Sequence, residues 1–277
     1  MLLKDLYQEY ISQKQKHLAA STLRYYRGYW RNWIAPTLAD VRVAGVTRPL
    51  IQQALQECSP TQANRIVTFL SSLFKFGGIS NPPTTGMRFI KEVARKRYVR
   101  EDEWQILSKG LLKLDKGNRG QKQLALYVRF LLFTGVRRDE AEQARYEDVD
   151  FKRGTLLVSG KTGQREVALT PILLESLDSS RSGFIFPATK SKTKGKNFSY
   201  AWKQFVNSIG LPELKRHDLR RTFGVTGLNN GLSLEEIQAL LGHSSIVTTQ
   251  KSYAWLLTDA KKKAATRMEA TLMRNLA

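Results

Sequence analysis

The segment LKRHDLRRTFG, residues 214–224, gathers side chains that could act on a phosphate group. If the segment is helical, His217, Arg220 and Arg221 fall at i, i+3 and i+4 on one face. Guanidinium groups bind phosphate oxygens in pairs, and an imidazole can carry a proton near neutral pH. The helix would then present a binding site for a polyanion on one face and pack against the protein core with its apolar face. A solvated basic face is the alternative interpretation of the same residues.

The composition favours a polyanionic partner for the whole chain. Of its 277 residues, 45 are Lys or Arg and 24 are Asp or Glu, which gives a net charge of +21. Such an excess repels itself unless a polyanion neutralises it, and nucleic acid is the first candidate. An anionic membrane surface is the rival. The apolar share of 42% is typical of a globular protein, and the length suits two domains.

Several classes of protein are disfavoured by the same inventory. No apolar run reaches the roughly 20 residues that span a bilayer, and the N-terminal MLLKDLYQEY does not resemble a signal peptide. A single cysteine, Cys58, excludes an internal disulfide framework. One cysteine and three histidines cannot assemble a zinc finger, so we predict no metal site.

Residues 1–80 show helical periodicity, and one helix within them carries a cationic stripe. After a predicted cap at Ser21 or Thr22, aromatic side chains recur at helical spacing, as expected for core packing. Arg24, Arg27 and Arg31 repeat at i, i+3 and i+7 beside them. We predict that these arginines contact the phosphates of a nucleic acid; an exposed structural face is the alternative.

The stretch GGISNPPTTGM, residues 77–87, breaks this periodicity with glycine, proline and turn-forming residues. We therefore predict a helical domain at 1–82, a linker at 83–94 and a second domain at 95–277. Residues 1–97 carry a net charge of +10 and the remainder +11. Both domains should thus face the same polyanion, in the manner of a two-part clamp.

The second domain is predicted to be mainly helical with a small antiparallel sheet. Residues 123–135 indicate a buried helix, and residues 137–151 a more polar one. Segments 155–159 and 165–169 alternate like two strands joined by a turn, and Ser233 with Glu236 forms a capping box. The chain closes on an amphipathic helix, whose apolar stripe is formed by Ala264, Met268, Leu272 and Leu276.

Five segments now stand in order along the chain: TGVRRDE (134–140), GKTGQRE (160–166), HDLRRTF (217–223), LGHSSIVTTQKSY (241–253) and the terminal helix. Together their order, residue types and spacing resemble the tyrosine recombinase, or phage integrase, family, most strongly over 130–255. The resemblance implies a mainly α (α+β) fold of the DNA breaking-rejoining type, preceded by a SAM-like core-binding domain. It also implies a site-specific DNA recombinase that works through a 3′-phosphotyrosyl intermediate and a Holliday junction, without metal, ATP or another cofactor.

Carried over residue by residue, the resemblance implies six catalytic side chains: Arg137, Lys161, His217, Arg220, His243 and Tyr253. Arg137 lies in a T-G-x-R-x-x-E pattern. Glu140 is the last residue of this pattern, and its implied role is structural. Lys161 lies in the hairpin turn and Tyr253 is the implied nucleophile. The remaining three belong to the H-x-x-R and L-G-H patterns.

Each implied role has a chemical reason. Two guanidinium groups, Arg137 and Arg220, can neutralise the charge that develops on a pentacoordinate phosphorus. A tyrosine hydroxyl, with a pKa of about 10, needs a base such as His217 to draw off its proton as it attacks. The departing 5′ oxygen needs a proton, which Lys161 can supply, and His243 would hydrogen-bond the phosphate oxygens.

The resemblance also implies contacts beside the active site and one departure within it. Arg138, Lys215 and Arg221 are predicted to contact the DNA backbone. Tyr253 follows His243 by ten residues, where the family usually has nine. The extra residue could be absorbed before the nucleophile helix, or it could misplace the hydroxyl.

The implied partner is double-stranded DNA carrying core recombination sites, bound by a homotetramer. The terminal helix is a candidate for docking onto a neighbouring protomer, with packing in its own chain as the alternative. Accessory DNA-bending or directionality proteins are also possible partners, and a membrane is not. The expected location is the cytoplasm of a prokaryote, at the nucleoid, for a host or mobile-element recombinase. An arm-binding domain is not apparent before the first helix.

Two rival functions remain open from the sequence. A catalytically inactive relative would be a sequence-specific DNA-binding regulator. A type IB topoisomerase would share the chemistry and relax DNA without partners.

Overall fold

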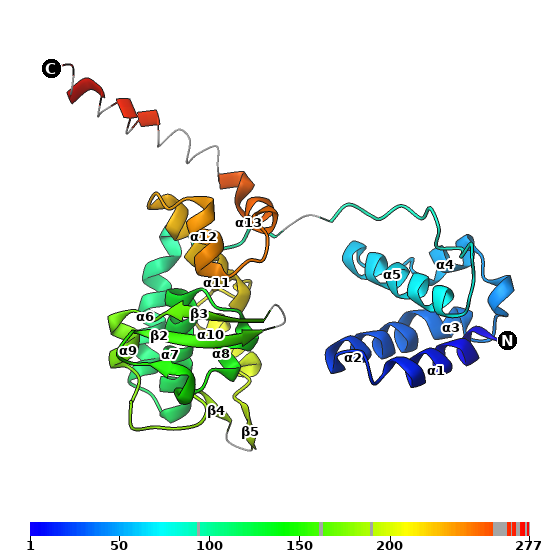
Figure 1. The fold of residues 1–277 in the computed structure, drawn as a ribbon, viewed down its shortest axis with the longest axis horizontal. Helices are drawn as coiled ribbons and strands as arrows, with labels where there is room; N and C mark the ends of the chain where they lie inside the picture. The colour runs from blue at the N-terminus through cyan, green and yellow to red at the C-terminus, as the bar shows by residue number, and fades with distance from the viewer. Residues whose placement is uncertain are drawn as a thin grey trace. The chain divides into compact units, whose positions relative to one another are not determined.

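A computed structural model describes residues 1–92, 95–160, 163–188 and 191–256, and in the tail residues 265, 266, 268, 269, 272–274 and 276. The chain divides into two compact units, Met1–Ala94 and Arg95–Ala277 (Figure 1). The second unit starts at the residue where the second domain was predicted to start. The segment predicted as a linker, 83–94, is part of the first unit.

The first unit is a bundle of short helices around α5. Its core is formed by one apolar cluster in which Leu3, Ile34, Phe69 and Phe74 are fully buried. Tyr7 stacks on Trp30 with ring centroids 4.0 Å apart, and the partly buried aromatic side chains of the second helix pack against the core, as predicted. The helices are α1 (Leu3–Lys14), α2 (Ala20–Tyr29), α3 (Ala35–Leu38), α4 (Arg48–Ala54) and α5 (Pro60–Phe76), with a π-helical turn at Trp30–Ile34 and a 3₁₀ turn at Val43–Gly45.

The start of α2 differs from the prediction. Ala19 is the N-cap and makes no side-chain capping bond, so a cap at Ser21 or Thr22 is wrong. Both hydroxyl residues lie inside the first turn instead. The Leu23 N–H already donates to the Ala19 carbonyl, so the first helical residue is Ala20 although two better capping residues follow it.

The segment that follows α5 is held against that helix, which explains why it belongs to the first unit. The side-chain amide of Asn64 donates to the carbonyl of Ile90 at 2.8 Å and accepts the Ile90 N–H at 2.9 Å. Asn64 and Thr61 also donate to the carboxylate of Glu92. These hydrogen bonds lower the pKa of Glu92. Composition alone does not reveal this side-chain pairing.

The second unit combines helices with a small sheet. Strands β1, β2 and β3 form an antiparallel sheet in that order, with Val158 opposite Arg165, and β4 pairs with β5. The strands are β1 (Val149–Asp150), β2 (Thr155–Gly160), β3 (Gly163–Ala168), β4 (Pro187–Ala188) and β5 (Ser191–Gly195). The helices are α6 (Trp104–Asp115), α7 (Arg119–Thr134), α8 (Arg138–Gln143), α9 (Pro171–Glu175), α10 (Ser199–Ser208), α11 (Arg216–Asn229), α12 (Leu234–Leu241) and α13 (Ile246–Tyr253), with 3₁₀ turns at Glu101–Glu103, Tyr146–Asp148 and Ala254–Leu256.

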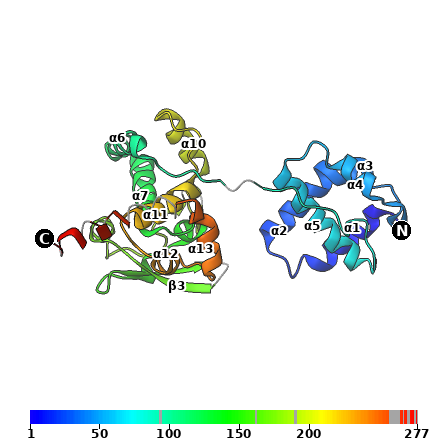
Figure 2. The ribbon, with the colours of Figure 1, turned by 90° about the horizontal axis from the view of Figure 1, so that it is seen from above.

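Two apolar clusters stabilise this unit, and α11 contributes to both. The larger one surrounds α7 and includes Tyr127, Phe130 and, from α11, Leu219. The smaller one joins α11 to α12 and α13, which lie close together (Figure 2). It includes Val225 on α11 and Tyr253 on α13. The helix that holds His217 and Arg220 is therefore fixed by the main core, whereas α12 and α13 pack on its other side. Within the described residues, no helix is long and apolar enough to cross a membrane.

Candidate active site

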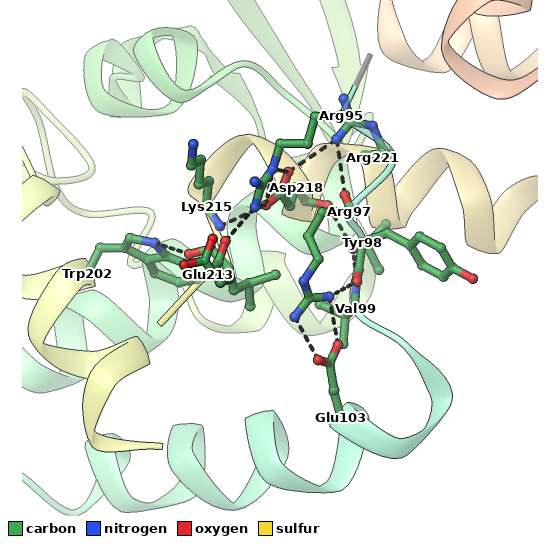
Figure 3. Close-up of polar contacts among 12 residues, drawn as sticks. Arg95, Arg97, Tyr98, Val99, Glu103, Trp202, Glu213, Lys215, Asp218 and Arg221 are labelled. Carbon is green, nitrogen blue, oxygen red and sulfur yellow. Dashed lines mark hydrogen bonds and ion pairs between the residues drawn. The ribbon is translucent and has the colours of Figure 1, made fainter. Parts of the chain in front are cut away.

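The start of α11 is fixed by one buried carboxylate, that of Asp218. It accepts the backbone N–H of Lys215 at 2.8 Å, which closes the first turn, and it pairs with Arg95 at 2.9 Å. Arg221 donates to the same carboxylate and to the carbonyl of Arg97 (Figure 3). An acid in the first turn also suits the positive end of the helix. These contacts tie the start of the second unit to the helix that carries the predicted site residues.

Arg220 points from α11 into the protein and is 3% exposed. Its Nη1 donates to the carbonyl of Gly135 at 2.6 Å and its Nη2 to that of Leu241 at 2.8 Å. Burial, and then the charge of Arg137, lowers the pKa of Arg220 to about 10. Carbonyl groups satisfy the guanidinium without neutralising it, so the side chain remains a fixed cation.

Arg137 is the N-cap of α8 and is held by Glu140. The Glu140 carboxylate accepts both the backbone N–H and Nη1 of Arg137 at 2.8 Å, and a further bond from Arg165 at 2.9 Å. The Nη2 of Arg137 donates to the carbonyl of Gly242 at 3.3 Å. Although burial opposes ionisation, the hydrogen bonds and cations lower the pKa of Glu140. Arg137 keeps a third of its side chain exposed, at 34%, and can therefore reach a ligand.

The charges of Arg137 and Arg220 act on both predicted histidines. His217 is exposed on α11, and desolvation followed by the charges of Arg220 and Arg221 lowers its pKa. His243 follows α12, and its Nδ1 lies 2.8 Å from the hydroxyl of Thr249 on α13. Burial and then Arg220 lower the pKa of His243 to about 4. At neutral pH both imidazoles are uncharged, so each can accept a proton or a hydrogen bond.

Tyr253 ends α13 and is buried, with 2% of its surface exposed. Its hydroxyl lies against Gly224, where an added Cβ would come within 2.2 Å of the oxygen. Gly224 is one turn beyond Arg220 on the same face of α11. Burial raises the pKa of Tyr253, and the charge of Arg220 opposes that rise. The extra residue between His243 and Tyr253 lies in a stretch that includes all of α13, where Thr249 and Tyr253 both face inward.

Lys161 lies outside the described residues. The strands on either side of it are described: Gly160 ends β2 and Gly163 begins β3, and these two residues pair across the hairpin. The predicted strands, 155–159 and 165–169, overlap the observed ones. The predicted polar helix at 137–151 is shorter than expected, because α8 ends at Gln143 and a 3₁₀ turn leads into β1.

A cleft of about 630 Å³ opens beside Arg137 and His217. Two of the predicted DNA contacts, Arg138 and Lys215, are exposed and line it. Arg221, the third, is half-buried, and its guanidinium is bound to Asp218 and to the Arg97 carbonyl. In the first unit, the stripe predicted on the second helix is exposed throughout: Arg24, Arg27 and Arg31.

Three basic residues that the sequence analysis did not single out contribute to the site. Lys203 and Arg216 line the cleft, and Arg216 also pairs with Glu142 at 2.5 Å. Arg165 on β3 pairs with Glu140. A signal existed for Arg165, since it alternates in phase with Val167, a buried residue of the same strand. Among the described residues, no cluster of His, Cys, Asp or Glu could hold a metal ion.

Two protein-family models match the chain. The phage integrase family model matches residues 98–258, and the model of the phage integrase N-terminal SAM-like domain matches residues 2–59. The chain belongs to the phage integrase family. Its enzyme class is tyrosine site-specific recombinase.

Curated relatives extend over most of the chain. Tyrosine recombinase XerA of Thermococcus onnurineus is 27% identical over 262 residues, which cover 88% of this chain and 87% of the relative. Tyrosine recombinase XerC of Oceanobacillus iheyensis is 27% identical over 277 residues and covers 89% of each chain. The similarity thus includes both units.

Solved structures share the fold. The Tn1549 transposon integrase in complex with transposon right end DNA superposes with a TM-score of 0.75 at 16% identity, over 97% of this chain and 100% of that one. A lambda integrase dimer bound to a COC′ core site gives 0.71 at 20% identity, over 90% and 97%. A lambda integrase tetramer bound to a Holliday junction gives 0.67 at 19%, over 88% and 76%. The mainly helical fold with a small antiparallel sheet, predicted from the sequence, is confirmed.

Proposed function

We propose that this recombinase cuts and rejoins duplex DNA through a 3′-phosphotyrosyl bond to Tyr253. The tyrosine oxygen attacks phosphorus, its proton passes to His217, and the bond to the 5′ oxygen breaks as Lys161 protonates that oxygen. The phosphotyrosyl bond conserves the bond energy, so a different 5′-hydroxyl can reverse the step without ATP. Arg137 and Arg220 stabilise the negative charge that develops on the pentacoordinate phosphorus group, and His243 donates a hydrogen bond to a phosphate oxygen.

The observation that supports this most is the excess of positive charge around Glu140. Three guanidinium groups, from Arg137, Arg165 and Arg220, are close enough to one another to shift pKa values, and Glu140 is the carboxylate among them. A buried cation excess is costly unless an anion arrives. A phosphodiester brings one negative charge, and the transition state has more negative charge to stabilise. The site is thus more complementary to the transition state than to the substrate.

The buried position of Tyr253 adds a condition to this scheme. Its hydroxyl packs on Gly224 inside the smaller apolar cluster, so attack requires α13 to shift. That cluster is separate from the main core, which lets α13 move while α11 stays fixed.

We further propose that four protomers assemble on two duplexes and pass through a Holliday junction, in the cytoplasm at the nucleoid. Met268, Leu272 and Leu276 are exposed in the described part of the tail, which supports docking of this stripe onto a neighbouring protomer. Ala264 lies outside the described residues. Truncation near residue 260 should abolish assembly and leave monomer binding intact, and unchanged assembly would exclude the docking role.

A suicide-substrate assay tests the proposed chemistry. Duplexes nicked beside candidate sites lose the short fragment after cleavage, so an active enzyme stays attached to DNA in denaturant. The wild type should give this adduct and Tyr253→Phe should not, and sequencing the trapped DNA would define the site. Binding without an adduct would identify a DNA-binding regulator, and relaxation of supercoiled DNA regardless of its sequence would identify a topoisomerase.

A further inference from the structure

Arg165 occupies a place in the sheet that an apolar residue would ordinarily fill. It lies opposite Val158, and its neighbours in the same row, Leu156, Val158 and Val167, are all buried. Directly opposed residues of an antiparallel pair point to the same face, so the Arg165 side chain points inward. A guanidinium in an apolar row needs compensating interactions, because burying a charge costs free energy unless the charge is paired.

Contacts of Arg165 with Glu140 and Gly242 provide part of this compensation. Its Nη2 donates to Glu140 at 2.9 Å, and the same carboxylate holds the backbone and side chain of Arg137. Its stem runs along Gly242, where an added Cβ would lie 2.2 Å from the Arg165 Cδ and Nε atoms. Gly242 in turn receives the other bond of Arg137 and precedes His243. Arg165 therefore contacts both residues that hold the Arg137 side chain, Glu140 and Gly242.

Only one of the three nitrogen atoms of this guanidinium has a described partner. Nε and Nη1 are buried and have no hydrogen-bond partner among the described residues. A side chain placed only for stability would be a poor choice here, since buried unsatisfied donors cost free energy. An unsatisfied buried polar group in a folded protein needs an explanation, and retention for function is one.

We propose that Arg165 is a positioning residue for strand cleavage: through Glu140 it fixes the Arg137 guanidinium, and along Gly242 it connects the β2–β3 hairpin to the loop with His243. The inference rests on the proposed cleavage reaction and deepens it. Arg165 needs no contact with the phosphate for this role.

The position of Arg165 can be tested without DNA. The charges that face His243 are Arg220, Arg137 and Arg165, and each opposes its protonation, as His217 also does once it is itself protonated. Three histidines make an NMR titration simple to assign with single His→Gln variants. Arg165→Met should raise the pKa of His243, and Arg165→Lys should leave it low. Arg153→Met is the matched control, because Arg153 pairs with Glu166 on the exposed face of the same sheet. An unchanged His243 pKa in Arg165→Met would overturn the inference.

Its role in cleavage is tested on the nicked duplex recovered from wild-type adducts. Arg165→Met should slow single-turnover cleavage by about 100-fold, as expected for a misplaced catalytic group, with DNA affinity within about threefold of wild type. Arg165→Lys should restore part of the rate, because one bond to Glu140 remains possible. If Arg165 acts through Glu140, adding Glu140→Gln to Arg165→Met should cost far less than Glu140→Gln alone.

The outcomes separate the two proposals. A wild type that forms no adduct overturns the proposed function. An active wild type with Arg165→Met cleaving as fast as Arg153→Met overturns the positioning role alone. Losses that multiply in the double variant would also overturn it, since they would mean that Arg165 acts independently of Glu140.

Discussion

Arg137 and Arg220 donate hydrogen bonds to two consecutive carbonyl oxygens, those of Gly242 and Leu241, at the end of α12. The end of a helix leaves carbonyl groups without intrahelical partners and carries a partial negative charge, which suits guanidinium groups. Two arginines from distant parts of the sequence therefore meet at one backbone position. Changes to that backbone should affect both.

Gly242→Ala is the first test of this relationship. Gly242 has φ 64°, and an added Cβ would meet Arg165 at 2.2 Å. Gly210 has φ 76° with open space around it, so Gly210→Ala carries the backbone strain without the collision. We expect Gly242→Ala to lose about 1–3 kcal/mol more unfolding free energy than Gly210→Ala in urea titrations. Equal losses would show that the site has room to relax.

Arg220→Lys tests whether the buried guanidinium acts on the transition state. A lysine keeps the charge but cannot donate to two separated carbonyls and a phosphate at once. Single-turnover cleavage should fall by about 100-fold or more, with DNA affinity little changed, because the lost contacts matter most when charge develops. A variant with lower affinity and an unchanged cleavage rate would assign Arg220 to substrate binding alone.

The lowered pKa of His243 predicts a pH dependence of stability. Unfolded histidine takes up a proton as the pH falls below about 6.5, whereas folded His243 stays neutral until the pH nears 4. The unfolded state therefore binds more protons in this window, and stability should fall as the pH falls from 6.5 toward 4, by at most about 3 kcal/mol from this residue. Urea unfolding of His243→Gln should show a shallower decline between pH 6.5 and 5 than wild type. Parallel curves would contradict the assignment.

Arg95 is expected to stabilise the second unit through Asp218. Removing it leaves a buried carboxylate with fewer partners, so Arg95→Met should cost about 1–3 kcal/mol. Arg181 forms an exposed pair with Asp178, with both side chains more than half exposed, and Arg181→Met should cost less than about 1 kcal/mol. Denaturant titrations compare the two directly. If Arg95→Met lowers the unfolding free energy no more than Arg181→Met does, water replaces the contact between Arg95 and Asp218.

Local features of this fold could be predicted from the sequence. The Ser233 hydroxyl accepts the backbone N–H of Glu236, and the Glu236 carboxylate accepts the backbone N–H of Ser233, as the capping box predicts. The alternation over 155–169 predicts the hairpin, because strand faces are set by residue parity. The predicted start of α2 was wrong, because the preference for a capping residue is local and does not by itself fix where a helix begins.

Long-range partners explain what the sequence could not reveal. Arg220 and Arg221 are adjacent and chemically alike, yet one is buried against carbonyls and the other binds Asp218 and the Arg97 carbonyl. Which arginine turns inward depends on α7 and α12, far away in sequence. Arg165 was missed for a related reason. The alternation of β3 predicts that the Arg165 side chain points inward, but its partner Glu140 lies in another element, which the sequence does not reveal.

The proposed chemistry requires that the hydroxyl oxygen of Tyr253 become bonded to DNA. Mass spectrometry of nuclease-trimmed, protease-digested adducts locates the phosphate on a single residue. We predict the nucleotide remnant on Tyr253, with an unchanged adduct yield in Tyr200→Phe, a variant of a tyrosine that is 75% exposed. A remnant on any other residue, or a wild-type yield of adduct from Tyr253→Phe, would contradict the account.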